Sequence, residues 1–458
     1  MLRHLLRGCV LTFAVQASAQ DCGFTSIGLL PLPELGTGTY QGWTGGLYPG
    51  GSNVPPAAHL QAGLLAAAAV QPRDGNGQLS PNGSMVLLSI GMSNTTQEFS
   101  AWQRISAIDG DRNPRLVVVD GAQGSQDAAV FANPNAQAWT VVDQRLAASG
   151  VTAAQVQVVW LKQALMAPPA GFPAHVLALQ SDLQAIAQNL RARFPNLRIC
   201  YLSSRTYGGY AFHPDRKEPL SFETGFAVQR LIAAQIAGDP ALNHDPAQGS
   251  VMAPWLAWGP YLWADGVVPR ADGLAWYCAD YQDDGIHPKP YGRHKVALLL
   301  DAFFRSEPTA VSWYLGGSGV PIPAVLPIGS GCTTPRGVVG LLHNSLPRLG
   351  NSTFALGANR LTPGLPAVLA FADGLDRLEL VRGCELYLDL NRLWPASLFA
   401  LVGASGTVQY PVPIPSTPSL AGLRFYAQWA CLDPVGAPLP SIGASLWLGP
   451  AGQVRIGP

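Results

Sequence analysis

The sequence predicts an α/β domain with a parallel sheet, followed by an all-β sandwich. Two observations lead to this prediction. From about residue 85 to residue 306, short apolar runs of strand type alternate with longer segments of helical period, an alternation typical of βαβ units. Beyond residue 336, short apolar runs separated by Gly and Pro replace the helical period, which favours a sandwich of short strands.

Local patterns predict the individual elements of the first part. Strands are expected where β-branched or apolar runs are bounded by turn residues, at 85–90, 115–120, 154–161 and 197–204. Helices are expected at 175–194, 221–238 and 292–305. The first of these helices carries apolar residues spaced by four, three and four, at Leu179, Leu183, Ile186 and Leu190. Residues with this spacing lie on one face of a helix.

The first 19 residues have the pattern of a secretory signal peptide. Arg3 and Arg7 precede an apolar stretch, and Ala17-Ser18-Ala19 supplies small residues for cleavage. These are the parts of such a signal, whereas a buried N-terminal helix is the alternative interpretation. We therefore expect cleavage near Ala19 and a secreted protein, either extracellular or periplasmic.

Changes in composition predict the remaining boundaries. Residues 20–306 are expected to form the first domain, with a loop-rich start and a core at 85–306. Residues 307–336 are rich in Pro, Gly and Ser and predict a linker. Residues 337–458 form the predicted β-sandwich, which carries few titratable residues and is interpreted as an accessory module.

The composition excludes several classes of protein. Charged residues make up 12% of the chain, and 28 basic residues balance 28 acidic ones. This balance does not favour the basic patch or stripe that a nucleic-acid partner would require, so we expect no such partner. After the signal peptide, no apolar run reaches the ~18 residues of a membrane span. No HExxH motif or CxxC pair occurs, so we expect no metal site. No cluster of Asp and Glu residues suits the carboxylate pair of a glycosidase. The sequence does not indicate the oligomeric state.

The cysteine count predicts disulfides. Of seven cysteines, Cys9 is lost with the signal peptide, and an even number of six remains in an oxidising compartment. The sequence does not determine how they pair. We predict Cys384–Cys431, because both lie in one C-terminal segment, and Cys200–Cys278.

Two short stretches carry the residue types of nucleophilic catalysis. In "DDGIHPKPYGRHKVA", Asp284 precedes His287 by three residues, so its carboxylate can turn back to the imidazole. In "GMSN", Ser93 follows the first predicted strand. A hydroxyl nucleophile needs such a base, oriented by an acceptor on its other nitrogen. The alternatives are that Ser93 only begins a turn and that Asp284 and His287 form a surface pair or cap a helix.

The order of residues at the strand ends resembles a known superfamily. Ser93 follows the first strand, Gly124 the second and Gln163 the third, while Asp284 and His287 precede the last helix. This order resembles the SGNH hydrolases, the GDSL-like esterases and lipases, over residues 85–306. The Gly-x-Ser-Asn motif at 91–94 is similar to the "GQSN" variant of carbohydrate acetylesterases such as sialate O-acetylesterase-like enzymes.

This resemblance implies a three-layer α/β/α fold and a role for each matching residue. Ser93 matches the nucleophile, His287 the general base and Asp284 its orienting partner. The backbone N–H groups of Ser93 and Gly124 match two donors of the oxyanion hole. The family's third donor is an asparagine in a Gly-x-Asn-Asp motif. Here "LKQA" stands at that place, so Gln163 offers the same amide on a longer side chain.

Further residues are predicted to contact the substrate. Asn94 adjoins the nucleophile, and Arg205 and Tyr207 follow the fourth strand in "SSRTYGGYAFH". Arg205 is expected either to hold an anionic group of the substrate or to form a structural salt bridge. The Trp- and Tyr-rich segment 254–266 is expected either to stack on sugar rings or to form a hydrophobic cluster beneath a loop.

Together these observations predict a secreted serine esterase without a cofactor. Its expected substrates are short-chain esters, acetyl esters above all, on small molecules or polysaccharides. The alternative is a non-catalytic carbohydrate- or surface-binding protein on a degenerate SGNH fold, which the departure at Gln163 and the sandwich module would suit. Acyl transfer by the same triad is a third possibility.

Overall fold

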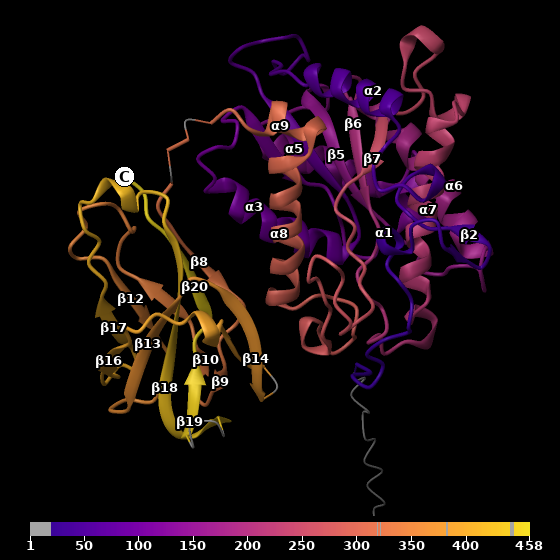
Figure 1. The fold of residues 1–458 in the computed structure, drawn as a ribbon. Coiled ribbons are helices and arrows are strands. Elements are labelled where there is room, and N and C mark those ends of the chain that lie inside the picture. The colour runs from indigo at the N-terminus through magenta and orange to yellow at the C-terminus, as the bar shows by residue number, and fades with distance from the viewer. Residues whose placement is uncertain (1–19, 318, 321, 382, 440–443) are drawn as a thin grey trace, which may run out of the picture.

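The computed structural model describes residues 20–317, 319–320, 322–381, 383–439 and 444–458. It consists of an α/β part with a central parallel sheet and an antiparallel all-β part (Figure 1). The predicted fold class is therefore confirmed. The predicted signal peptide, residues 1–19, lies outside the described residues.

The parallel sheet forms the centre of the first part. Its strands, in spatial order, are β4 (Leu116–Asp120), β3 (Met85–Gly91), β5 (Val156–Lys162), β6 (Ile199–Ser203) and β7 (Trp255–Trp258). Every residue of β3, β5, β6 and β7 is buried. Strands covered on both faces have such continuous apolar sequences, which is why β3 to β6 could be located from the sequence. Because Trp255 and Trp258 belong to the buried strand β7, they form part of the hydrophobic core.

Helices pack in two groups, and in Figure 1 α8 and α7 flank the strands on opposite sides. One group contains α2 (Ala57–Ala68), α3 (Ser93–Ala107), α8 (Pro290–Ser306) and α9 (Pro308–Tyr314). The other contains α4 (Ala128–Ala132), α5 (Gln137–Ala148), α6 (Ala174–Arg193) and α7 (Leu220–Ile236). The predicted helices correspond to α6, α7 and α8. The segment before β3 carries α1 (Leu32–Leu35) and the short pair β1 (Thr39–Tyr40) and β2 (Trp43–Thr44).

Helix α3 was not predicted, although it carries the candidate nucleophile. Its buried positions include Asn94, Thr95, Glu98 and Ser106 beside Phe99 and Trp102. Polar residues on the buried face conceal the apolar period by which a helix is recognised in a sequence.

The C-terminal part consists of antiparallel strands. The larger sheet has the order β16 (Leu398–Leu401), β13 (Pro366–Ala372), β18 (Arg424–Leu439), β20 (Ala451–Arg455) and β8 (Ala324–Ile328), with β19 (Ala444–Leu448) paired to β18. A smaller sheet has the order β11 (Leu341–His343), β12 (Ala355–Ala358) and β17 (Val408–Pro411). Two further pairs are β9 (Thr333–Thr334) with β10 (Gly337–Val338), and β14 (Leu375–Val381) with β15 (Cys384–Leu388). Leu356 of β12 and Trp429 of β18 belong to one buried cluster, so the two sheets share a core.

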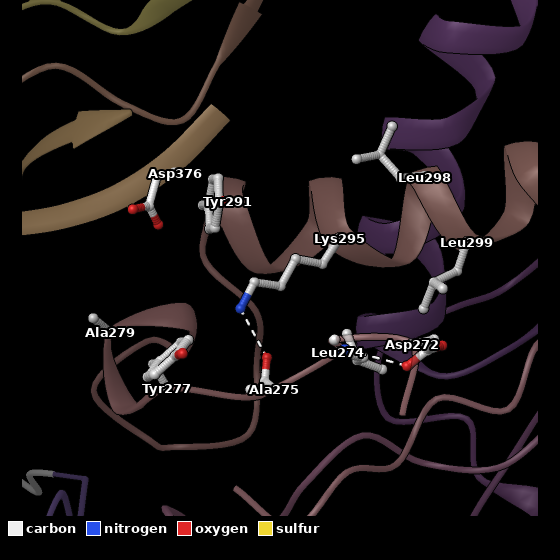
Figure 2. A pocket seen from close by; sticks show the side chains of 11 residues that line it. Asp272, Leu274, Ala275, Tyr277, Ala279, Tyr291, Lys295, Leu298, Leu299 and Asp376 are labelled. Carbon is white, nitrogen blue, oxygen red and sulfur yellow. Dashed lines mark hydrogen bonds between the residues drawn. The ribbon is translucent and has the colours of Figure 1, made fainter. Parts of the chain in front are cut away.

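The segment predicted as a linker, 307–336, contains regular structure. It holds α9, which packs on α2 and α8, and β8, which pairs with β20 at the edge of the larger sheet. The two parts also touch directly, because Arg455 of β20 donates a hydrogen bond of 2.7 Å to the carbonyl of Ile108. A cavity of about 680 Å³ lies at this junction, where Lys295 of α8 extends toward the Ala275 carbonyl and Asp376 belongs to the opposite, C-terminal part (Figure 2).

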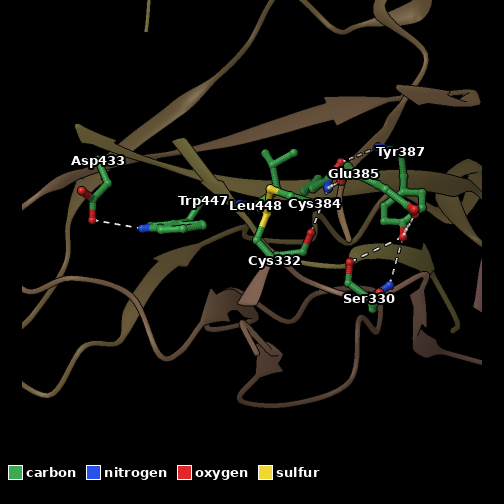
Figure 3. Close-up of a disulfide and its surroundings, with 10 residues drawn as sticks. Ser330, Cys332, Cys384, Glu385, Tyr387, Asp433, Trp447 and Leu448 are labelled. Atoms are coloured by element: carbon green, nitrogen blue, oxygen red, sulfur yellow. Dashed lines mark hydrogen bonds between the residues drawn. A yellow bond between two sulfur atoms is a disulfide. The ribbon is translucent and has the colours of Figure 1, made fainter. Parts of the chain in front are cut away.

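The two disulfides of the described residues differ from the predicted pairs. Cys22 pairs with Cys278, and Cys332 pairs with Cys384 (Figure 3). The predictions Cys384–Cys431 and Cys200–Cys278 are therefore wrong. Cys200 lies within strand β6 of the parallel sheet and Cys431 within the core of the sandwich, and both are buried free thiols. Cys431 and its predicted partner Cys384 pack in different hydrophobic clusters, and Cys384 is bonded to Cys332. Cys200 is buried within β6, while its predicted partner Cys278 is bonded to Cys22.

Within the described residues, no helix combines the length and the apolar character needed to cross a membrane.

The buried thiols give a chemical test of the disulfide pattern. Burial raises the pKa of Cys431 to about 11 and raises that of Cys200 as well, so little reactive thiolate exists at neutral pH. We expect native protein, residues 20–458, to resist alkylation by iodoacetamide and unfolded, unreduced protein to take up two equivalents. Peptide mapping should find both labels on Cys200 and Cys431. A label on Cys22 or Cys332 would contradict these pairs.

Candidate active site

The candidate nucleophile lies where β3 turns sharply into α3. Ser93 is the first residue of α3, two positions after the end of β3 at Gly91. A β-carbon at position 91 would lie 2.4 Å from the Lys162 carbonyl oxygen and 2.3 Å from the Thr95 hydroxyl. Only glycine permits this approach. The close packing of Gly91 therefore brings Ser93 to the carboxyl edge of the parallel sheet, where ligands of such folds bind.

Ser93, His287 and Asp284 form a continuous chain of hydrogen bonds. The Ser93 hydroxyl lies 2.6 Å from His287 Nε2, and His287 Nδ1 contacts Asp284 Oδ2. With the Nδ1 proton directed at the carboxylate, Nε2 is left to accept the proton of Ser93. Ser93 and His287 are both partly exposed, so a ligand can reach them.

The loop that carries Asp284 and His287 is held by its own backbone. Asp284 Oδ1 accepts hydrogen bonds from the N–H groups of Ile286 at 2.9 Å and His287 at 3.0 Å. Burial disfavours the charged form of Asp284, but the hydrogen bonds from the His287 ring and these two N–H groups outweigh it and lower its pKa to about 2. Asp284 is therefore a carboxylate at neutral pH, as the orienting partner of an imidazole must be.

A cavity of about 230 Å³ opens beside Ser93. Its lining comes from the loops after β3, β4, β5 and β6 and from the loop before α8: Met92, Ser93, Asn94, Gly124, Ser125, Lys162, Gln163, Ala164, Met166, Arg205, Arg216, Ile286 and His287. The segments that follow four parallel strands thus meet at one site. Within the described part of the chain, no group of three or more His, Cys, Asp or Glu side chains is placed to hold a metal ion.

Gly124 and Gln163, the predicted oxyanion donors, both line this cavity. A β-carbon at position 124 would lie 3.8 Å from Ser93 Cβ, so the Gly124 backbone adjoins Ser93. Gln163 Nε2 donates a 3.1 Å hydrogen bond to the carbonyl of Gln126. An amide nitrogen carries two N–H groups, so one of the two remains for a ligand.

The predicted substrate-binding residues divide into two groups. Asn94 and Arg205 line the cavity and are buried. Tyr207 does not line it: the ring is 1% exposed, and the hydroxyl donates to the Phe24 carbonyl at 2.9 Å. The prediction that Tyr207 contacts the substrate is wrong, because the chain after Arg205 turns into the core and the N-terminal segment covers it.

A buried ion pair beneath the candidate nucleophile was not predicted. Lys162 Nζ lies 2.7 Å from Glu98 Oε1 and 2.5 Å from Oε2, and both side chains are at most 2% exposed. Burial lowers the pKa of Lys162 and raises that of Glu98, while their mutual attraction opposes both shifts. A lysine at the end of an apolar strand indicates that a buried counter-charge is required. The sequence could not identify that partner, because Glu98 lies 64 positions earlier in the chain.

A second buried carboxyl lies under the loop after β6. Glu218 accepts hydrogen bonds from Gly208 N–H at 2.7 Å, Phe222 N–H at 3.0 Å and the Trp263 indole N–H at 2.8 Å. Burial raises the pKa of Glu218 to about 7, and these three hydrogen bonds only partly oppose the effect. Its charge therefore changes near neutral pH.

Comparison with known proteins finds distant structural similarity. No family model matches the chain, and no curated protein matches it. One similar solved structure is protein YxiM of Bacillus subtilis, with 13% identity, a TM-score of 0.29, and coverage of 49% of this chain and 57% of that one. Another is a gut microbial diltiazem-metabolizing enzyme, with 12% identity, a TM-score of 0.28, and coverage of 66% and 60%. The chain thus spans less than two thirds of the length of either protein.

A third similar structure is the periplasmic domain of a lipopolysaccharide acetyltransferase from Salmonella serovar Paratyphi A. It has 11% identity and a TM-score of 0.27, and the match covers 53% of this chain and 93% of that domain. At this distance the function is inferred from the geometry of the site alone.

Removing one member of the buried pair should destabilise the fold strongly. Glu98→Ala leaves the Lys162 ammonium buried without a partner, which typically costs about 3–5 kcal/mol of unfolding free energy. The double variant Glu98→Met/Lys162→Met removes both charges and should lose far less. Chemical denaturation of the wild type, the single and the double variant measures this, and equal losses in the two variants would contradict the role of the charge pair.

The raised pKa of Glu218 predicts a pH-dependent stability. The unfolded chain releases this proton near its ordinary value of 4.5, and the folded protein retains it up to about pH 7. Between these values the unfolded state binds fewer protons, so the unfolding free energy falls as pH rises. The difference of about 2.5 units corresponds to roughly 3 kcal/mol.

The measurement compares wild type with Glu218→Gln from pH 5 to pH 8 by denaturant titration. The wild type should lose stability relative to the variant across this range. Parallel profiles would show that Glu218 does not titrate in this window.

Proposed function

We propose that the protein is an exported serine esterase of the SGNH hydrolase type, which cleaves short-chain esters, acetyl esters of carbohydrates above all. The observation that carries the proposal is the 2.6 Å contact of Ser93 Oγ with His287 Nε2, with Asp284 on the other ring nitrogen and a cavity beside the hydroxyl. Residues 20–306 would form the catalytic domain and 337–458 an accessory module. Two disulfides support export, since they persist in oxidising compartments.

Each step of ester cleavage has a candidate group in this site. Ser93 Oγ attacks the carbonyl carbon while His287 Nε2 takes its proton, and the Asp284 carboxylate stabilises the imidazolium. The oxyanion receives hydrogen bonds from the N–H groups of Ser93 and Gly124 and from the free amide N–H of Gln163. His287 then protonates the leaving alcohol. Water, deprotonated by His287, cleaves the acyl-enzyme and releases the carboxylic acid and Ser93.

Loss of the nucleophile tests the proposal directly. Ser93→Ala should lower kcat/KM for 4-nitrophenyl acetate by at least about 10³-fold, because the acyl-enzyme cannot form. Ser149→Ala, which removes an exposed hydroxyl after α5, serves as the control and should keep wild-type activity. A fluorophosphonate should label wild type at Ser93 and leave Ser93→Ala unlabelled.

The same experiment separates the other functions. Equal rates for wild type and Ser93→Ala, or no label on Ser93, would overturn catalysis and favour a binding protein. Product analysis with an added alcohol acceptor distinguishes hydrolysis, which yields the free acid, from acyl transfer, which yields a new ester.

A further inference from the structure

Arg205 brings a buried positive charge to the cavity of Ser93. It lies two residues after the end of β6, at the same edge of the sheet as Ser93, and its side chain lines the cavity with Ser93 and His287. Only 8% of Arg205 is exposed. Burying a cation costs free energy unless a partner compensates it, so the partners of this guanidinium decide its role.

Among the described residues, the Arg205 guanidinium has no hydrogen-bond or ion-pair partner. The hydrogen bond that Arg205 makes within the described chain comes from its backbone: the N–H donates to Thr224 Oγ1 at 3.5 Å. The five N–H donors of the side chain are thus left for something else. The expected structural salt bridge is absent from the described residues. Buried polar groups are paired in folded proteins, so an unpaired guanidinium beside a candidate nucleophile points to a ligand.

The carboxylates that act on Arg205 are occupied elsewhere. Glu98 and Glu218 both favour the charged form of Arg205 and raise its pKa. However, Glu98 forms its ion pair with Lys162, and Glu218 accepts three hydrogen bonds from other residues. Although burial lowers the pKa of Arg205, a guanidinium remains protonated at neutral pH.

No described residue lining the cavity carries a negative charge that could offset Arg205. Of the described lining residues, none is Asp or Glu, and Arg216 adds a second guanidinium from the loop before α7. Lys162 contributes little net charge, since Glu98 neutralises it. A ligand that enters the cavity therefore meets the candidate nucleophile and two arginines that form no ion pair within the described residues.

We propose that Arg205 binds a carboxylate of the substrate, so that the preferred esters are acidic: the carboxylate and the scissile acyl group belong to one molecule. This inference rests on the proposed function for its account of turnover. A guanidinium matches a carboxylate through two parallel N–H···O bonds. A neutral ester leaves that charge buried and unpaired, so the site discriminates against it.

Paired esters test the selectivity and locate the carboxylate. On the alcohol side, 4-acetoxybenzoate is compared with its methyl ester. On the acyl side, mono-4-nitrophenyl glutarate is compared with 4-nitrophenyl butyrate. In at least one pair the acidic member should have the higher kcat/KM, and Arg205→Met should lower the acidic-to-neutral ratio about ten- to hundredfold. Arg205→Lys keeps the positive charge but loses the two parallel N–H donors of the guanidinium, so it should lower the ratio less.

The control variant is Arg115→Gln, which removes one exposed charge beside the start of β4, at the opposite edge of the sheet. Its ratio should equal that of wild type. Thermal unfolding of Arg205→Met and Arg205→Lys confirms that each variant is folded. An unchanged ratio in both folded variants, or the same loss in Arg115→Gln, would overturn the proposal.

A binding experiment separates this inference from the esterase proposal. Calorimetry with Ser93→Ala measures binding of glutarate and 4-hydroxybenzoate, with inorganic sulfate and phosphate as alternative anions. At least one carboxylate should bind, and Ser93→Ala/Arg205→Met should bind it about ten- to hundredfold more weakly. Such a result supports the carboxylate site even if no ester is turned over. Absence of carboxylate binding, or binding of sulfate or phosphate alone, would overturn it.

Discussion

The close packing of Gly91 between β3 and α3 is the constraint on which the site depends. Without a side chain at this position, the chain approaches the Lys162 carbonyl and Thr95, and α3 can begin immediately beyond the sheet. This places Ser93 at the carboxyl edge and brings Glu98, five residues later, under it against Lys162. One backbone contact thereby positions both the candidate nucleophile and the ion pair that supports it.

The electrostatics of the site contrast with the rest of a weakly charged chain. Only 12% of the residues are charged, yet several of them are buried around this cavity: Glu98, Lys162, Arg205 and Glu218. Two of these groups neutralise each other, and Glu218 avoids a full charge through its raised pKa. Among the described residues, no carboxylate forms a hydrogen bond or an ion pair with the Arg205 side chain. A fold that spends free energy on an unpaired cation at one point gains most if a ligand provides the missing charge.

Rigidity of the loop before α8 is as important as its chemistry. Gly285 has a φ of +68°, and a β-carbon there would lie 1.8 Å from the Tyr210 carbonyl oxygen. The Phe212 N–H binds the Asp284 carbonyl, and the Gln282 N–H binds the carbonyl of His287. The Cys22–Cys278 disulfide joins the N-terminal segment to the same stretch of chain. The His287 imidazole is therefore oriented by a loop that the surrounding structure holds in one conformation, which would reduce the entropy cost of the proposed reaction.

The sequence by itself determined the fold class, the strands β3 to β6 and the helices α6 to α8, because strand and helix periods are local properties of the chain. It also identified Ser93, Asp284 and His287 as candidates through their order along the strands, although their roles stay a proposal. Only the tertiary structure decided which distant side chains meet. It paired Cys22 with Cys278, buried Tyr207 and joined Glu98 to Lys162. It also left the Arg205 side chain without a hydrogen-bond or ion-pair partner among the described residues. Such contacts depend, to within a few ångströms, on how elements remote in sequence are placed relative to one another. The local periodicity of the sequence contains no information about that placement.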